Sequence, residues 1–425
     1  MILGKYSMGI GDRFTHQGKA QLRALIRAKK HGVDVVPVWN KSHREHMIIG
    51  TSPADVRREA DEAVKALGWR SSYYVDADHI SMKNVDIFVN SSDFFTLDVA
   101  DFTGRCADES DVCSFVDKHR KHVGSLSIPG IEESIVVTEE RIEAIAHKFL
   151  LAVKEAGNIY RHVEAAKGAE NFITEISMDE TDESQTPVEL FFILAAIADE
   201  SIPAQTIAPK FTGRFNKGVD YVGDVGRFTR EFEEDLAVIN FAIKEFGLPE
   251  NLKLSVHSGS DKFSIYGAIS KAIRKYDAGL HLKTAGTTWL EELIGLAMAS
   301  GEGLEIAKEI YPKALRRFDE LCGPYATVID IDREKLPSPK VVDGWSGEEY
   351  ANALRHDPSC GEYNPNFRQI LHVAYKVAAE MGERYLSALD KFKDVIGRNV
   401  TENIYERHLR RIFVGKLDYI GNCIF

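Results

Sequence analysis

Short apolar segments alternate with longer amphipathic segments over residues 1–300. The short segments end in polar or glycine-rich loops, which is typical of buried strands. Eight such strands are predicted, at residues 2–8, 34–40, 72–78, 85–90, 171–178, 205–210, 252–257 and 279–285. Parallel strands need crossover helices, and eight of them can close on themselves. The alternation therefore predicts an α/β fold, a (β/α)8 TIM-type barrel, with a doubly wound open sheet as the alternative.

Two regions of the chain do not follow this alternation. Residues 91–138 form a long polar gap between the fourth and fifth predicted strands, which we interpret as an insertion over the barrel mouth. Beyond residue 300 the strand pattern ends. Helical periodicity follows in three segments, at residues 303–320, 366–394 and 401–413. We therefore expect a catalytic barrel over residues 1–300 and a mainly helical C-terminal extension over residues 301–425 that packs on it.

The charge balance disfavours several classes of function. The 425 residues include 53 Lys and Arg against 65 Asp and Glu, which gives a formal net charge of −12. Such a charge argues against nucleic acid or an anionic membrane as a partner. The longest apolar run, 190–198, is less than half a bilayer span, and the first residues lack the apolar core of a signal peptide. Five scattered cysteines without a Cys-x-x-Cys pair fit reduced thiols, so we expect a cytoplasmic protein.

The third and fifth predicted strands carry acidic residues and a histidine. Strand three runs into Asp76, Asp78 and His79, which are costly after an apolar strand unless they meet a cation or each other. The alternative is a helix N-cap by Asp78 beside a hydrogen-bonded histidine. In strand five, Glu175 and Asp179 share one face, so Glu175 lies inside the barrel if that face points inward. A buried carboxylate there suits proton transfer, with a structural ion pair as the alternative.

The seventh and eighth predicted strands carry histidines and a lysine. His257 is at the tip of strand seven, where an imidazole could bind a divalent ion, and Ser258 opens a loop whose backbone amides could bind an anion. Strand eight puts His281 and Lys283 on one face. Lys283 suits an anionic substrate group or a developing oxyanion, whereas His281 is equally a core histidine or a metal ligand. Arg13 lies in a turn after strand one that lacks the third glycine of a dinucleotide fingerprint.

Several segments together resemble the tagaturonate epimerase family. They are residues 74–79, 172–180, 210–224, 255–266 and 280–287, with the most specific similarity at 76–79 and 257–264. The resemblance covers residues from about 6 to 300 and, more weakly, to about 380. It implies that Asp78 is the proton acceptor, Glu175 the proton donor, His79 and His257 the metal ligands, and Lys217 a substrate contact. Family members are expected to carry a further amino-terminal segment ahead of residues 9–13, whereas this chain starts close to the first strand.

The implied activity is a divalent-metal-dependent epimerisation of fructuronate and tagaturonate at C4. Because C4 lies β to the ketone, its hydrogen is not acidic by enolisation. Two routes survive, namely retro-aldol opening and re-closure of the C3–C4 bond, or hydride removal and return with a redox cofactor. The missing dinucleotide fingerprint favours the first route, which needs a Lewis acid, a base and an acid. The metal is expected to be Zn, Mn, Ni or Co, with His281, Glu175, or substrate and water as third ligand.

Polar groups near the strand ends are candidates for substrate contacts. Lys217, Lys283 and Arg13 could bind the substrate carboxylate, and Asp179 and Ser258 complete the set. The expected partner is a small sugar acid, and a homo-oligomer is the candidate assembly. Two alternative functions remain. One is a metal-dependent isomerase or aldolase acting on another polyol, and the other is a non-catalytic barrel that binds a sugar acid.

Overall fold

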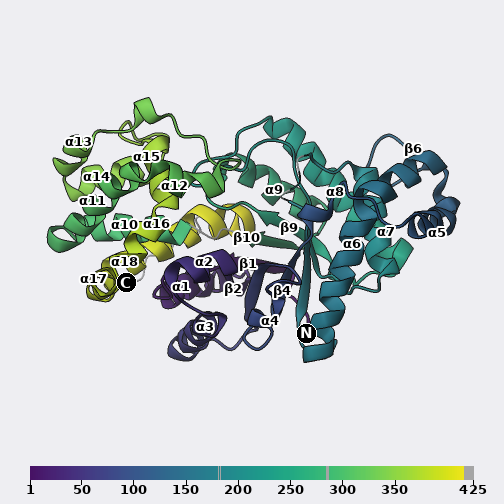
Figure 1. Ribbon diagram of the computed structural model, residues 1–425, viewed down its shortest axis with the longest axis horizontal. Coiled ribbons are helices and arrows are strands. Elements are labelled where there is room, and N and C mark those ends of the chain that lie inside the picture. The colour runs from purple at the N-terminus through teal and green to yellow at the C-terminus, as the bar shows by residue number, and fades with distance from the viewer. Residues whose placement is uncertain (180, 182, 284–286, 416–425) are drawn as a thin grey trace.

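A closed barrel of eight parallel strands forms the centre of the computed structural model, which describes residues 1–179, 181, 183–283 and 287–415 (Figure 1). The barrel strands are β1 (Tyr6–Ile10), β2 (Val36–Ser42), β3 (Tyr74–Ile80), β4 (Phe94–Asp98), β7 (Ile173–Ser177), β8 (Thr206–Ala208), β9 (Lys253–His257) and β10 (Leu280–Lys283). They neighbour one another in the order β1-β10-β9-β8-β7-β4-β3-β2, and β2 pairs back with β1. The predicted (β/α)8 barrel is confirmed, and the open doubly wound sheet is excluded because this sheet has no edge.

Helices connect the strands and begin where the local sequence favours a helix start. They are α1 (Gly18–Lys30), α2 (His43–Ile49), α3 (Pro53–Leu67), α4 (Val85–Phe88), α6 (Glu139–Lys167), α7 (Pro187–Asp199), α8 (Val225–Phe246), α9 (Phe263–Lys275) and α10 (Thr287–Met298). In α7, Thr186 and Glu189 form a capping box and Pro187 occupies the first turn. The apolar run of this helix is buried because α6 and α8 pack on it. Within the described residues, every helix is too short or too polar to cross a bilayer.

The predicted fourth strand at residues 85–90 is wrong. Residues Val85–Phe88 form the short helix α4, and the strand follows at residues Phe94–Asp98. Val85 and Phe88, three residues apart, are buried, while Ile87 between them is 48% exposed. This spacing is that of a helix, whereas the strand prediction had interpreted the same apolar residues with the two-residue period of a strand.

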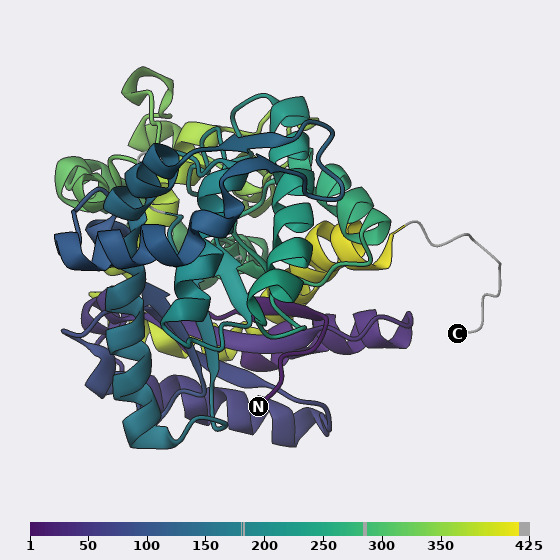
Figure 2. The same cartoon turned by 90° about the vertical axis from the view of Figure 1, so that its right-hand side faces the viewer.

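The segment between β4 and β7 folds outside the barrel sheet. It contains η1 (Ala100–Phe102), α5 (Glu109–His119), η2 (Arg120–His122), β5 (Gly124–Leu126) and β6 (Ile135–Val137). β5 and β6 form an antiparallel pair of their own, and α5 packs on α6. Figure 2 shows this segment from the side, in front of the barrel. The region interpreted as an insertion at 91–138 therefore includes the barrel strand β4 in its first residues.

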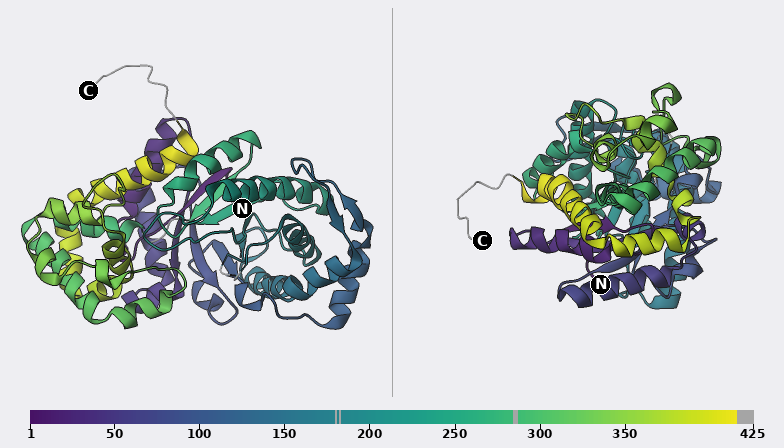
Figure 3. Two further views of the ribbon diagram at one scale, coloured as in Figure 1. Left: turned by 90° about the horizontal axis from the view of Figure 1, so that it is seen from above. Right: turned by 90° about the vertical axis from the view of Figure 1, so that its left-hand side faces the viewer.

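Helices that follow α10 form a layer at the opposite end of the molecule from α5 (Figures 1 and 3). They are α11 (Gly301–Arg316), α12 (Phe318–Cys322), η3 (Gly323–Tyr325), η4 (Arg333–Lys335), α13 (Pro339–Asp343), α14 (Gly347–Leu354), α15 (Pro365–Val373), α16 (Tyr375–Ala379), α17 (Glu383–Lys391), α18 (Lys393–Glu402) and the π-helix η5 (Asn403–Val414). α18 packs on α1 and α10, and η5 packs on α1 and α9. The predicted helical character of this region is confirmed.

A buried ionic cluster joins these helices to the loop that follows β9. Asp261 of that loop accepts a hydrogen bond from Arg368 of α15 at 3.0 Å. His356 Nδ1 and His408 Nε2 lie 3.2 and 3.1 Å from its carboxylate oxygens, and all four side chains are at most 2% exposed. Since an uncompensated buried charge is costly, these contacts couple the position of the loop to that of the extension.

The inward face of the barrel changes from apolar to polar along the strands. Alternate residues of each strand point inward, and the first layer is formed by a small apolar cluster, Leu3, Val38, Tyr74, Phe94 and Ile173. Two residues further along β3, β4 and β7, the same face carries Asp76, Thr96 and Glu175, each at most 2% exposed. The carboxyl ends of the strands, where TIM barrels carry their active sites, therefore receive a dense set of polar side chains.

Candidate active site

An irregularity in β3 turns both Asp78 and His79 toward the site. Neighbouring strand residues normally point to opposite faces, so only one of the two should face inward. The pairing of β3 with β4 shifts register between Ala77 and Ile80, and His79 has a positive φ of 54°. Such bulges redirect side chains next to active sites. As a result, His79 Nδ1 donates a hydrogen bond to Asp78 Oδ1 at 2.9 Å instead of lying on the outer face.

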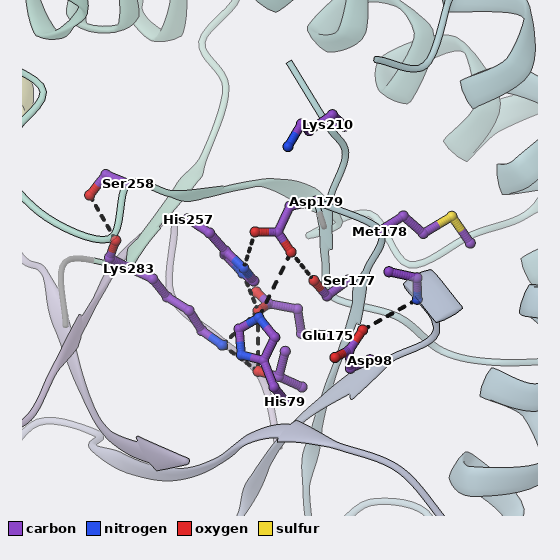
Figure 4. Close-up of polar contacts among 12 residues, drawn as sticks. His79, Asp98, Glu175, Ser177, Met178, Asp179, Lys210, His257, Ser258 and Lys283 are labelled. Carbon is purple, nitrogen blue, oxygen red and sulfur yellow. Dashed lines mark hydrogen bonds and ion pairs between the residues drawn. The ribbon is translucent and has the colours of Figure 1, made fainter. Parts of the chain in front are cut away.

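Two histidines and a carboxylate converge at the mouth of the barrel (Figure 4). His79 Nε2 lies 3.8 Å from Asp179 Oδ1, and His257 Nδ1 lies 3.2 Å from Asp179 Oδ2. The ligand atoms of these three side chains all lie within 4.8 Å of one another. The two imidazole rings are 5.1 Å apart between centroids. A set of two nitrogens and one carboxylate oxygen is one that zinc and several first-row transition metals accept.

In each imidazole, the nitrogen that does not face Asp179 donates a hydrogen bond to another carboxylate. His79 Nδ1 donates to Asp78, and His257 Nε2 donates to Glu175 Oε1 at 2.8 Å. His257 Nδ1 is buried and faces Asp179 Oδ2 at 3.2 Å, without the geometry of a hydrogen bond. This arrangement is the usual environment of metal-binding histidines, in which a carboxylate fixes the ring and leaves the other nitrogen for the ion. The residues present therefore fit a divalent metal at His79, Asp179 and His257.

Lys283 is the cation at the centre of the acidic residues. Its ammonium group lies 2.8 Å from Asp76 Oδ2, 3.0 Å from Asp78 Oδ1 and 2.9 Å from Glu175 Oε1, and it also contacts Thr96. Burial would lower the pKa of Lys283, but these three carboxylates raise it well above its usual value. The lysine is 3% exposed and its charge is satisfied by the protein, whereas the sequence had suggested a substrate contact.

The carboxyl groups around Lys283 differ in their affinity for protons. Burial, together with the charges of Asp78 and Glu175, raises the pKa of Asp76 to about 7 against the pull of Lys283. For Asp78 and Glu175 burial is outweighed by Lys283 and the adjacent histidines, which hold both pKa values below their usual range. The site therefore combines two ionised carboxylates with one carboxyl that exchanges its proton near neutral pH.

The two cluster histidines are protonated in the absence of a metal. Burial opposes the charge on both rings. Asp78 and Asp179 nevertheless raise the pKa of His79 well above its usual value, and Asp179 and Glu175 raise that of His257 to about 9. The same contacts hold the pKa of Asp179 well below its usual range. A metal must therefore displace protons to bind here.

Two of the residues suggested by the sequence occupy structural positions. His281 lies deeper in the barrel, where its Nδ1 is 2.8 Å from Ser7 Oγ and its ring packs 5.2 Å from that of Phe94. Burial lowers its pKa to about 3. Ser258 Oγ donates to the carbonyl oxygen of Lys283 at 2.8 Å. The third member of the cluster is Asp179 rather than His281.

Arg13 and Lys217 have contact partners outside the histidine cluster. Arg13 pairs with Glu45 and stacks over Tyr375, and Lys217 lies near Tyr325. In the described part of the chain, neither forms an ion pair or hydrogen bond with the cluster of His79, Asp179 and His257.

Three polar side chains of the barrel interior were not assigned roles from the sequence. Thr96 Oγ1 lies 3.0 Å from both Asp76 oxygens and 3.2 Å from Glu175 Oε1, and Thr206 Oγ1 donates to Glu175 Oε2 at 2.8 Å. All three side chains are buried, and the Thr96 hydroxyl connects Glu175 to Asp76. The sequence marks Asp76 as one of two acids at the end of strand three, and its spacing of two residues from Asp78, which gives both the same inward face, is the signal that could have added it to the site.

Comparisons with known proteins agree with this architecture. A family model described as tagaturonate epimerase matches residues 2–417. The tagaturonate/fructuronate epimerase of Thermotoga maritima is 28% identical over 420 residues, which cover 95% of this chain and 80% of that protein. Crystal structures of the fructuronate-tagaturonate epimerase UxaE from Cohnella laeviribosi, one native and one with glycerol, match with TM-scores of 0.75 and 0.78.

Both crystal structures are 23% identical to this chain, and each match covers 96% of it. The matches cover 81% of the glycerol-bound chain and 82% of the native one. At that identity they show a shared fold. The family match, in contrast, spans almost the whole chain and confirms the resemblance seen in the sequence. This protein therefore belongs to the tagaturonate epimerase family and is an isomerase.

Proposed function

We propose that this isomerase interconverts fructuronate and tagaturonate by inverting C4, with a divalent metal held by His79, Asp179 and His257. The observation that best supports the proposal is the convergence of these three side chains, whose ligand atoms lie within 4.8 Å of one another. The names of the Thermotoga and Cohnella relatives supply the substrate pair. Bound there, a divalent cation would act as a Lewis acid toward the ketone and enolate oxygens of the sugar.

The route we propose is retro-aldol opening and re-closure of the C3–C4 bond. C4 lies β to the ketone, so its hydrogen cannot be removed by simple enolisation. Opening the bond requires a base that takes the proton of the C4 hydroxyl, and re-closure on the other face of the aldehyde requires its return. We assign the base to Asp78, because neighbouring charges keep this carboxylate ionised.

We assign the return of the proton to Glu175, which shares Lys283 with Asp78. Lys283 Nζ lies 3.0 Å from Asp78 and 2.9 Å from Glu175, so a proton gained by one carboxylate changes the charge felt by the other. Asp76, with a pKa of about 7, contacts the same ammonium group and can accept the excess proton between the two half-reactions. Asp78 and Glu175 also orient His79 and His257, so each carries a second, positioning role.

The decisive experiment combines metal analysis with product identification. Purified protein is assayed for bound metal, and fructuronate is then followed by NMR with metal, after chelation and after metal is restored. We expect tagaturonate to form only when metal is present. With metal at saturating concentration, Asp78→Asn should lower kcat by about 10²–10⁴-fold, the usual contribution of general base catalysis.

The alternative outcomes separate the parts of the proposal. Unchanged fructuronate in the presence of bound metal contradicts the substrate assignment. Cleaved three-carbon fragments without the C4 epimer indicate an aldolase instead. Conversion that survives complete chelation contradicts the metal requirement.

A further inference from the structure

Three basic side chains of the barrel loops converge on two tyrosines of the helical extension. Arg13 follows β1, Arg44 lies in α2 after β2, and Lys217 follows β8. The guanidinium carbon of Arg13 lies 4.4 Å from the ring centroid of Tyr375. The ring centroid of Tyr325 lies 5.6 Å from the guanidinium carbon of Arg44 and 5.7 Å from Lys217 Nζ. The two tyrosine hydroxyls are 2.9 Å apart, so the three cations surround one hydrogen-bonded pair.

A fourth basic side chain and a buried histidine continue this group. Lys262 Nζ donates to Ser260 Oγ at 2.9 Å, and the same oxygen accepts from the backbone N–H of Gly218 at 2.9 Å. His372 of α15 packs against Gly218 and is 2% exposed. Burial and the surrounding cations hold the pKa of His372 well below its usual range, so the ring is neutral. Burial lowers the pKa of Lys262 to about 7 against the pull of Asp261 and Asp220, so this lysine is partly protonated near neutral pH, and His372 adds a neutral ring to the group.

The positive charge of this region exceeds the negative charge that the protein supplies. Glu45 pairs with Arg13. Across residues 1–179, 181, 183–283 and 287–415, no carboxylate oxygen lies within 4.0 Å of a nitrogen of Arg44, Lys217 or Lys262. The imbalance is local, because the whole chain has a formal net charge of −12. Like charges held together at a partly buried site favour the binding of an anion.

Two buried donor or acceptor atoms in the same region lack a partner. Arg13 Nε and His372 Nε2 form no hydrogen bond with any described residue, although both side chains are at least nine-tenths buried. A buried polar atom without a partner costs free energy, and such atoms mark places where a ligand or water is missing. The same cations also affect the pKa of Tyr325. Burial would raise its pKa, but Arg13, Lys217 and Arg44 and the hydrogen bond with Tyr375 lower it.

We propose that these residues form the site that binds the substrate carboxylate. The basic cluster consists of Arg13, Arg44, Lys217, Lys262, Tyr325 and His372. The inference rests on the proposed function and adds to it the means by which the enzyme distinguishes a uronate from a neutral ketose. All four basic side chains follow barrel strands at their carboxyl ends, the same rim that carries His79 and His257. Because Tyr325 and His372 belong to the extension, the helical layer completes the site.

The test compares a charged and a neutral substrate that share the reacting carbons. Initial rates are measured for fructuronate and fructose with metal-loaded wild type, Lys217→Gln, Arg44→Gln and the matched control Lys118→Gln. Lys118 is an exposed lysine of α5 that pairs with Asp199, at the far end of the molecule. Thermal unfolding of each variant checks that the fold is retained. Where fructose turnover is below detection, its inhibition constant against fructuronate replaces KM.

We expect Lys217→Gln to raise KM for fructuronate by about tenfold to a hundredfold, the loss of one hydrogen bond to a charged group. Its kcat for fructuronate and its constants for fructose should stay close to wild type, and Lys217→Arg should restore much of the affinity. Arg44→Gln should act in the same direction with a smaller effect, because Arg44 is more exposed. Lys118→Gln should change nothing.

The outcomes distinguish this inference from the proposed function. If wild type converts fructuronate and neither Lys217→Gln nor Arg44→Gln changes KM, the carboxylate assignment is overturned and the proposed function stands. If wild type with bound metal converts no fructuronate, the proposed function fails, and calorimetric binding of fructuronate decides the assignment. Weaker binding to Lys217→Gln then supports it, and equal or absent binding overturns it. A preference for fructose 6-phosphate over fructuronate assigns the cluster to a phosphate group and also overturns it.

Discussion

Replacement of Lys283 by methionine tests whether the acidic barrel interior depends on one buried cation. The change keeps an unbranched apolar stem and removes the ammonium group, so Asp76, Asp78 and Glu175 lose a partner at 2.8, 3.0 and 2.9 Å. Loss of one partner of a buried ion pair costs about 3–5 kcal/mol of unfolding free energy. The three carboxylates share that partner, and Asp76 takes up a proton near neutrality. We therefore expect a single loss of about 3–5 kcal/mol at pH 7 rather than three such losses.

The loss should depend on pH in one direction. In the wild type, Lys283 outweighs burial and holds the pKa values of Asp78 and Glu175 below their unfolded values. Their contribution to stability is present above the unfolded pKa and is lost only as the pH falls through the folded pKa. Without Lys283, burial and mutual repulsion raise these pKa values, and only the adjacent histidines oppose the rise. The folded variant then holds more protons than the folded wild type, so its deficit in stability shrinks from pH 8 toward pH 5.

Urea unfolding of the metal-free proteins, followed by circular dichroism between pH 5 and pH 8, measures both quantities. Lys253→Met is the matched control, because Lys253 is equally buried in the barrel but donates to the backbone carbonyls of Leu3 and Gly4. Burial lowers the pKa of Lys253 to about 8, so this lysine stays largely protonated in both states from pH 5 to pH 7. The control loss should be constant over that range. A Lys283→Met deficit as small as the control's, or as independent of pH, would refute the reasoning.

Three further predictions concern the metal and the extension. Asp179→Asn should weaken metal binding by about tenfold or more in calorimetry, whereas His281→Gln should leave it unchanged; equal effects would contradict the assignment of Asp179. Metal affinity should rise with pH up to about 9, because the ion displaces protons from His79 and His257, and titrations in buffers of different ionisation enthalpy should detect their release. Asp261→Asn should cost about 3–5 kcal/mol and expose the extension to limited proteolysis, while an unchanged cleavage pattern would argue against its docking role.

The barrel was predictable because most of its strands are apolar runs that end in polar loops. β4 shows where this approach fails. Residues 85–89 and 94–97 are both short apolar runs, and the polar residues 91–93 between them were interpreted as the start of an insertion. The choice between them is made by pairing with β3 and with β7, which lies far along the chain. A pattern that is local in sequence cannot report such a contact.

The site was predictable where it follows from strand alternation. Glu175 was expected to point inward with the polar face of its strand, and it lies there between Thr96 and Thr206. His79 has the opposite parity to Asp78, so its approach to the site depends on the register shift and on a positive φ. A single sequence gives no signal for that bulge. The same is true of contacts between the barrel and the extension, since residues such as Tyr375 meet Arg13 only in the folded chain.

The charge balance of the site explains why the barrel can hold so many acidic groups without a metal. Its ionised carboxylates and its cations are equal in number, namely Asp78, Glu175 and Asp179 against Lys283 and protonated His79 and His257. Binding of a divalent ion must expel two imidazole protons, which replaces two positive charges by two others. The surrounding carboxylates therefore keep their partners in both states, and the interior avoids an uncompensated charge. This exchange connects the stability of the metal-free barrel to the proposed chemistry, because the same carboxylates orient the histidines and carry the protons.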